Sequence, residues 1–191
     1  MTHLYSRRKM LTTAISTVTV FAVGDLFFRK SSSAQAAATS SKEVWIVEFS
    51  NSGVRNGRVR LAKIIKSEAE WQAQLSPASF QITRHEGTER PFSGKLLNVH
   101  DAGIFRCICC NTALFDSQTK FESGTGWPSF YQPIAEENIT KTDDYAFGME
   151  RTAVTCTRCD AHLGHVFNDG PKPTGLRFCM NSVALNFVPR A

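Results

Sequence analysis

Four of the six cysteines in this 191-residue chain form two C-x-x-C pairs, a spacing typical of metal ligands. The pairs are Cys107 with Cys110 and Cys156 with Cys159, with residues 111–155 between them. Two turns of this kind bring four thiolates to the corners of a tetrahedron, the geometry in which Zn²⁺ has every position filled. The spacing therefore predicts one structural zinc ion per chain. Redox-active pairs, disulfides and an iron site are the alternatives.

Cys179 has the sequence surroundings of a nucleophile, in the stretch GLRFCMNSVALNF. Arg177 precedes it by two residues and Asn181 follows it by two, so the three side chains would share one face of a strand. A cation beside a thiol lowers its pKa and favours the reactive thiolate. The alternative is that Cys179 is a small buried hydrophobic residue.

One aromatic ring and two imidazoles are the other candidates for chemistry. Trp127 lies in the loop FESGTGWPSF, where its rigid ring can form a wall of a small apolar pocket or simply pack in the core. His162 and His165 follow the second cysteine pair and can donate a proton near neutral pH, or support the zinc thiolates. Asp169 is expected either to orient one histidine or to cap the turn at Gly170.

The elements that position these residues are predicted to begin with two strands and a short helix. Apolar and β-branched stretches predict strands at 44–49 and 58–66, with turns in NSG and RNG between them. Ser67 and Glu70 form a capping box for a helix that ends at Gln74.

A second short helix and a run of antiparallel strands are predicted to follow. Ser76 and Pro77 can start the helix, because proline suits its first position. Beyond residue 90, short apolar runs broken by Gly, Pro, Asn and Asp are typical of β structure. The candidate strands are Gly103–Arg106, Tyr145–Arg151 and Val183–Val188. We expect one catalytic domain at 67–191, preceded by a linker and β extension at 37–66.

Residues 1–36 are predicted to be a twin-arginine-type export signal. Arg7-Arg8-Lys9 precede an apolar run, and small residues suited to cleavage follow it. Asp25 near the end of that run disfavours a membrane span. The chain is therefore expected in the periplasm, with no stable membrane span after cleavage; the alternative is a membrane anchor that faces the periplasm.

The positive charge of the chain belongs mainly to this N-terminal segment. Residues 1–36 hold five Lys/Arg and one acid, so their removal takes +4 from the formal +5 and leaves about +1. The remaining chain has no basic surplus for a nucleic-acid surface, and no nucleic-acid partner is expected.

Five ordered stretches together resemble one enzyme family over residues 67–189. They are ERPFSG, RCICCNTALF, KFESGTGWPSF, CTRCDAHLGHVFNDGP and LRFCMNSVAL. This combination is similar to the peptide-methionine (R)-S-oxide reductases, the B-type methionine sulfoxide reductases. The resemblance implies a mainly β fold of two antiparallel sheets rolled around one core, with short N-terminal helices and a structural Cys₄ zinc site far from the active site.

The resemblance also implies a role for each candidate residue. Trp127 would hold the methyl group of the sulfoxide while Cys179 attacks its sulfur, which gives methionine and a cysteine sulfenic acid. His162 and His165 would polarise or protonate the oxygen, and which of them gives the proton stays open. Arg177 and Asn181 would position the site, with Arg177 favouring the thiolate.

The chain departs from many relatives at Thr125, where they carry a second, resolving cysteine. Cys109 is flanked by zinc ligands, so we expect a packed thiol that does not reach Cys179. An external thiol is therefore expected to complete the cycle: a thioredoxin-like protein, a glutaredoxin-like protein or a small thiol.

The implied protein is a monomeric repair enzyme of the oxidative stress response, acting on oxidised proteins or peptides that contain methionine sulfoxide. Two other classes compete with this interpretation. One is a zinc-stabilised binding module with Cys179 in its core, and the other is a thiol–disulfide oxidoreductase that uses its C-x-x-C pairs.

Overall fold

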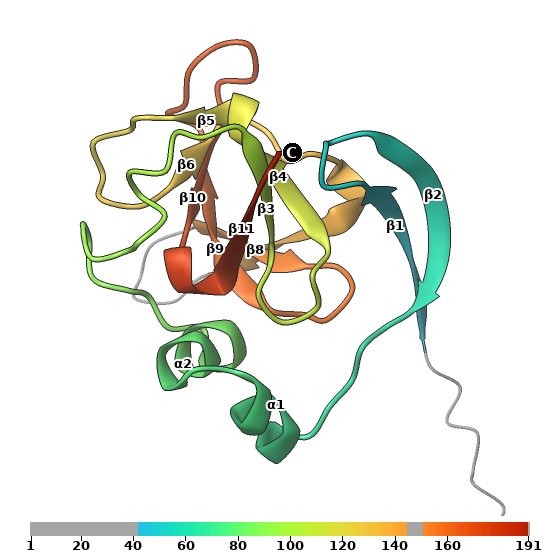
Figure 1. The fold of residues 1–191 in the computed structure, drawn as a ribbon. Helices are drawn as coiled ribbons and strands as arrows, with labels where there is room; N and C mark the ends of the chain where they lie inside the picture. Colours follow the sequence, from blue (N-terminus) through green and yellow to red (C-terminus); the bar gives the residue numbers. More distant parts are fainter. Residues whose placement is uncertain (1–41, 145–150, 191) are drawn as a thin grey trace, which may run out of the picture. The chain divides into compact units, whose positions relative to one another are not determined.

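The structure is a computed structural model that describes residues 42–144 and 151–190 (Figure 1). The predicted export signal at 1–36, the first part of the predicted linker and all but the last residue of the predicted strand Tyr145–Arg151 lie outside the described residues. Within the two described ranges, no helix is both long and apolar enough to cross a membrane.

An antiparallel hairpin of β1 (Glu43–Phe49) and β2 (Arg55–Ala62) opens the described chain. The predicted first strand is confirmed. The second begins and ends earlier than the predicted 58–66, and the RNG stretch lies in the strand rather than in a turn. The reason is local: the Ser50 side chain and carbonyl accept hydrogen bonds from Val54 N and Gly53 N, so the chain has already reversed at residue 54.

The two predicted helices are present as α1 (Glu68–Gln74) and α2 (Pro77–His85). Ser67 and Glu70 form the predicted capping box in front of α1. The Ser76 side chain caps α2 by accepting from Ser79 N, with Pro77 in its first turn. Each helix buries an aromatic face against the β structure, through Trp71 and Phe80.

Two larger antiparallel sheets form the body of the described fold (Figure 1). The six-stranded sheet runs, in spatial order, through β5 (Lys120–Phe121), β6 (Ser129–Phe130), β10 (Arg177–Met180), β9 (His162–Phe167), β8 (Arg151–Cys156) and β7 (Ile139–Asp144). The three-stranded sheet runs through β11 (Leu185–Pro189), β3 (Gly103–Cys107) and β4 (Ala113–Asp116). Short 3₁₀ turns are η1 (Ser117–Thr119), η2 (Glu136–Asn138) and η4 (Ser182–Ala184).

Aromatic rings join the two larger sheets into one core. Phe115 of β4 stacks on Phe130 of β6 with ring centroids 4.4 Å apart, and Phe105 of β3 meets Phe130 edge-on at 4.9 Å. All three rings are fully buried, as is Phe178 of β10. The predicted fold class, mainly β with antiparallel sheets around one core and short N-terminal helices, is confirmed, and the hairpin adds a third, two-stranded sheet.

The predicted last strand, Val183–Val188, is wrong at its start. Ser182–Ala184 forms η4, and β11 begins only at Leu185. The cause is a contact from far away in the sequence, because the Glu89 carboxylate accepts hydrogen bonds from Ser182 N at 2.7 Å and Val183 N at 3.2 Å. These two amides are therefore not available to a β ladder. The predicted strand Gly103–Arg106 is confirmed as β3, one residue longer.

Candidate active site and candidate metal centre

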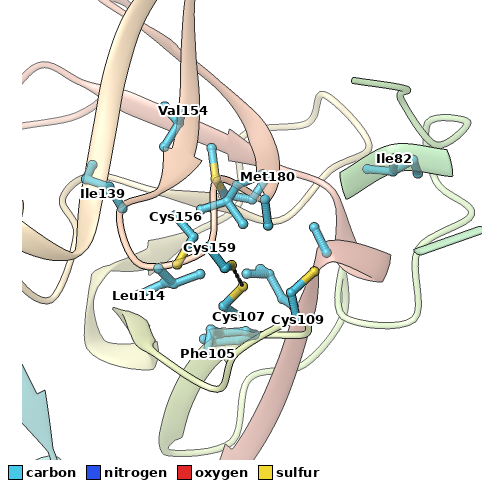
Figure 2. Close-up of a cluster of buried hydrophobic side chains, with 14 of the residues drawn as sticks. Ile82, Phe105, Cys107, Cys109, Leu114, Ile139, Val154, Cys156, Cys159 and Met180 are labelled. Atoms are coloured by element: carbon cyan, nitrogen blue, oxygen red, sulfur yellow. Dashed lines mark hydrogen bonds between the residues drawn. The ribbon is translucent and has the colours of Figure 1, made fainter. Parts of the chain in front are cut away.

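The four cysteines of the two C-x-x-C pairs converge, with all their sulfur atoms within 4.8 Å of one another. Cys107 Sγ lies 3.6 Å from Cys159 Sγ (Figure 2), and Cys110 Sγ lies 3.5 Å from Cys156 Sγ. Sulfur atoms bound to zinc at about 2.3 Å in a tetrahedron stand about 3.8 Å apart. The sulfur positions therefore fit a single tetrahedral metal ion.

Two matching turns hold these sulfurs in place. In the first, Asn111 N donates to Cys107 O at 2.8 Å, and in the second Asp160 N donates to Cys156 O at 2.9 Å. Asn111 and Asp160 both adopt left-handed backbone angles, with φ of 62° and 55°. Asn and Asp tolerate this conformation better than other residues with side chains. The local sequence thus builds the same knuckle twice.

The environment of the sulfurs also suits a cation. Cys107, Cys156 and Cys159 are buried and Cys110 is half-buried, among core residues such as Leu114 and Met180 (Figure 2). The sulfur of Cys109 first, then those of Cys110, Cys156 and Cys159, raise the pKa of the buried Cys107, because several thiolates close together in one apolar site repel one another. A divalent cation at the centre would remove that repulsion, so the donor set fits a metal ion.

Cys109 lies outside this tetrahedron. Its side chain is 6% exposed and its sulfur is 3.5 Å from the Thr83 hydroxyl of α2. Figure 2 shows it directed away from the sulfurs of Cys107 and Cys159. The expectation that Cys109 is packed is confirmed.

Cys179 lies on β10, between β9 and β6, where it pairs with His165 on one side and Ser129 on the other. It is half-buried and lines a small cavity of about 140 Å³. The cavity is lined by Thr88, Trp127, Arg151, Gly164, His165, Phe167, Cys179 and Asn181. The structure therefore brings four of the predicted site residues to one cavity: Trp127, His165, Cys179 and Asn181.

Burial governs the protonation of Cys179. It raises the pKa of the thiol, although the Thr125 hydroxyl, with its oxygen 3.9 Å from the sulfur, and the Arg177 guanidinium both lower it. The expected direction of the Arg177 effect is correct, but the loss of solvent around the sulfur outweighs it. The resting group is therefore a thiol at neutral pH.

Arg177 does not line the cavity. Its Nε and Nη2 donate to the two carboxylate oxygens of Asp169, each at 2.8 Å, and its guanidinium lies 4.3 Å from the ring centroid of Phe167. Arg177 thus supports a cavity wall through Phe167. The expectation that Asp169 orients a histidine or caps the Gly170 turn is wrong, because both of its oxygens bind Arg177.

The two histidines have different surroundings. His165 Nε2 lies 2.9 Å from Asp144 Oδ2, which Arg151 also contacts at 2.9 Å. His162 is 3% exposed, packs edge-on to His165 with ring centroids 5.3 Å apart, and has no hydrogen-bond partner at Nε2 among the described residues. It borders an adjoining cavity of about 440 Å³ rather than the one beside Cys179. Burial lowers the pKa of His162 to about 4, so it is neutral at pH 7.

Glu89 is a site residue that sequence reasoning missed, beyond its place in ERPFSG. Its carbonyl accepts from Trp127 Nε1 at 3.1 Å, and its N–H donates to Asn181 Oδ1 at 3.0 Å. Asn181 Nδ2 in turn donates to Leu163 O at 3.1 Å. Glu89 therefore fixes two cavity walls through its backbone, while its carboxylate holds η4. Only its position among Gly and Pro residues hints at this role.

Gly164 is also a requirement that sequence reasoning missed. A Cβ atom at this position would lie 2.1 Å from Cys179 O on the neighbouring strand. Only glycine lets β9 approach β10 so closely. The spacing between Cys179 and His165 therefore depends on this residue.

Comparison with known proteins gives one consistent result. The SelR domain family matches residues 75–189. The chain is 58% identical over 130 residues to "Peptide methionine sulfoxide reductase MsrB" of Pseudomonas putida (strain W619), covering 68% of this chain and 98% of the relative. It is 54% identical over 125 residues to the protein of the same description from Herminiimonas arsenicoxydans, covering 65% of this chain and 91% of the relative.

The buried, neutral His162 predicts an acid-sensitive fold. Its folded-state pKa of about 4 lies below its ordinary value of 6.5, so the unfolded chain takes up a proton as pH falls between these values and the folded chain does not. The contribution of His162 to stability is fully present above pH 6.5 and falls by about 3 kcal/mol by pH 4. The free energy of unfolding, measured in urea from pH 7.5 to pH 4.5, should fall less steeply in His162→Gln. His85→Gln, whose ring is partly exposed, is the control and should show the same dependence of unfolding free energy on pH as the wild type. If His162→Gln also kept the wild-type dependence, the assignment would be contradicted.

Proposed function

The chain belongs to the MsrB family of peptide methionine sulfoxide reductases, the (R)-S-oxide reductases, and we propose that it works through a cysteine sulfenic acid at Cys179. The observation that carries the proposal is the cavity of about 140 Å³ in which Cys179 meets Trp127, His165 and Asn181. A methyl sulfoxide offers an apolar methyl group, an electrophilic sulfur and an acceptor oxygen. The cavity presents an aromatic wall, a thiol and an imidazole to match them.

In the proposed reaction, Cys179 attacks the sulfoxide sulfur and takes over its oxygen. The S–O bond of the substrate breaks, methionine leaves, and the cysteine becomes a sulfenic acid, so two electrons pass from the enzyme sulfur to the substrate sulfur. One proton ends on the S–OH group and one leaves the thiol, so no net proton is consumed. Trp127, held by Glu89 O, is the wall against which the methyl group packs.

We assign the proton on the sulfoxide oxygen to His165 rather than to His162. His165 borders the cavity and its ring is held by the Asp144 carboxylate. His162 does not border that cavity and is neutral at pH 7. It packs against His165 and keeps the ring in place. Asn181 and Arg177 position the site, the latter through Phe167.

An external thiol completes the proposed cycle. Thr125, 3.9 Å from the Cys179 sulfur, stands where a resolving thiol would act, and the buried Cys109 contacts α2. A thiol of a thioredoxin-like or glutaredoxin-like protein, or a small thiol, attacks the sulfenic acid, releases water and forms a mixed disulfide. A second thiol then frees Cys179. The four converging cysteines hold zinc, which stabilises the fold and takes part in no step.

The first prediction from the proposed function concerns the chemistry of Cys179. The protein is expected to reduce the R epimer of a methionine sulfoxide peptide and leave the S epimer untouched. Cys179→Ser should lose about a thousandfold or more in kcat/KM, because no other described side chain can take over as nucleophile. Mass spectrometry after one equivalent of substrate, without reductant, should find one added oxygen on Cys179. Cys109→Ser is the control with full activity; a Cys109–Cys179 disulfide would disprove the external-thiol cycle.

The second prediction concerns the metal. Elemental analysis should find one zinc per chain, and Cys159→Ser should lose it. The unfolding temperature should then fall by tens of degrees, because a structural zinc site contributes on the order of 10 kcal/mol. Cys109→Ser, changed within the same segment, should keep the zinc and the unfolding temperature. Iron in place of zinc, or unchanged metal content in Cys159→Ser, would refute the assignment.

The third prediction concerns location, for which Arg7-Arg8 and the apolar run after them are the support. We propose that the folded protein is exported to the periplasm. Replacing both arginines with lysine should leave the protein in the cytoplasmic fraction, because the twin-arginine route reads this pair, whereas Lys9→Arg should have no effect. If the variant with both arginines replaced by lysine still reached the periplasm, export by the twin-arginine route would be disproved.

A further inference from the structure

A second, larger hollow lies beside the reactive cavity. It has a volume of about 720 Å³ and lies between α2, the loop from Gly87 to Leu96, and η4. The Ser79 hydroxyl of α2 donates to Val183 O at 2.8 Å, which holds the helix and η4 side by side (green and red in Figure 1). Apolar side chains make up much of its lining: Ala78, Ile82, Leu96, Ile108, Val183 and Leu185. We call this hollow the α2 groove.

The α2 groove meets the reactive cavity at Thr88. This exposed residue lines both of them. Glu89, the next residue, also lines the groove, and its carbonyl accepts a hydrogen bond from Trp127 of the cavity. The short stretch of backbone at Thr88 and Glu89 therefore separates the α2 groove from the cavity in which the sulfoxide sulfur would react.

The size of the reactive cavity limits what it can hold. At about 140 Å³ it is well below the roughly 300–1,000 Å³ of ordinary ligand sites. A cavity of this volume suits one side chain and not a stretch of polypeptide. When the substrate is a polypeptide, the residues next to that methionine must therefore lie on the surrounding surface, and the α2 groove is the apolar hollow that borders the cavity there.

The charged residues that line the α2 groove indicate which kind of polypeptide segment it would bind. Arg90 and Lys95 line it, both are exposed, and neither makes an ion pair with another described residue. Glu89 is the acidic residue of the lining, and its carboxylate is already engaged by Ser182 N and Val183 N. The groove thus combines an apolar floor with two unpaired cations, which complements a segment with apolar and acidic side chains.

We propose that the α2 groove binds the substrate polypeptide beside the oxidised methionine, and that it selects segments with apolar and acidic residues there. The inference rests on the proposed function, because it takes the cavity at Cys179 as the place of the sulfoxide. It adds substrate selection by a surface that makes no contact with the reacting atoms.

The test compares three substrates, each with the R epimer: N-acetyl-methionine sulfoxide amide, a peptide with Leu and Glu on both sides of the sulfoxide, and the same peptide with Lys in place of Glu. Wild type should prefer the acidic peptide. Arg90→Glu combined with Lys95→Glu should lower kcat/KM for the acidic peptide about tenfold and raise it for the basic one, because rim charges act on encounter and register. The rate on the small amide should stay unchanged.

Two controls separate the groove from general effects. Lys42→Glu combined with Arg55→Glu makes the same change in net charge on exposed residues of the hairpin region and should leave the peptide preference intact. Ala78→Tyr, which fills the groove, should slow both peptides and spare the amide, whereas Ala73→Tyr on the exposed face of α1 should not.

The outcomes distinguish the inference from the function on which it rests. An unchanged peptide preference after charge reversal, or an equal loss on the small amide, would show that the groove does not select substrate. A dimer in sedimentation that charge reversal dissociates would identify a second copy as the occupant and overturn the proposal. No reduction of any of the three substrates by wild type would instead refute the proposed function.

Discussion

The pairing of β9 with β10 is the constraint on which the candidate active site depends. Its register sets Cys179 opposite His165 and Arg177 opposite Phe167. Asn181 N donates to Leu163 O directly after the paired stretch, and Gly164 lets the two backbones approach closely enough for this register. A slip by one residue would turn Cys179 to the opposite face of the sheet. The strand register therefore sets the relative positions of Cys179 and His165, which the residue types alone do not determine.

The cysteine cluster explains how this ladder is tied to the rest of the fold. Cys107 ends β3 of the three-stranded sheet, and Cys156 ends β8, the neighbour of β9 in the six-stranded sheet. A metal at the cluster would thus join the two sheets, as the stacked rings of Phe115 and Phe130 do within the core. None of the four cysteines is among the residues that line the reactive cavity. The candidate metal site and the candidate active site are therefore separate, so a substitution can change the stability of the fold without changing the reactivity of Cys179.

Sequence reasoning succeeded where the determining interactions are local. The two knuckles, the Ser67 capping box and the Ser76-Pro77 helix start each depend on residues a few positions apart. It failed where a distant partner decides. The start of β11 depends on Glu89, which lies far away in the sequence. Asp169, in the loop after β9, binds Arg177 of β10 rather than a histidine, a pairing that only the turn between the two strands creates. Neither pairing leaves a periodic signal, since one partner sits in an irregular loop in each case.

Burial of Cys179 has a consequence for the proposed reaction. A thiol with a raised pKa is mostly protonated at neutral pH, and protonated thiols react slowly with oxidants. The same protonation keeps on the cysteine a proton that can replace the one that His165 gives to the sulfoxide oxygen. When substrate fills the cavity, His165 can pass a proton to the sulfoxide oxygen and recover one from the thiol, so the thiolate forms only as it attacks. Desolvation, which opposes the free thiolate, thereby couples its formation to the presence of a sulfoxide.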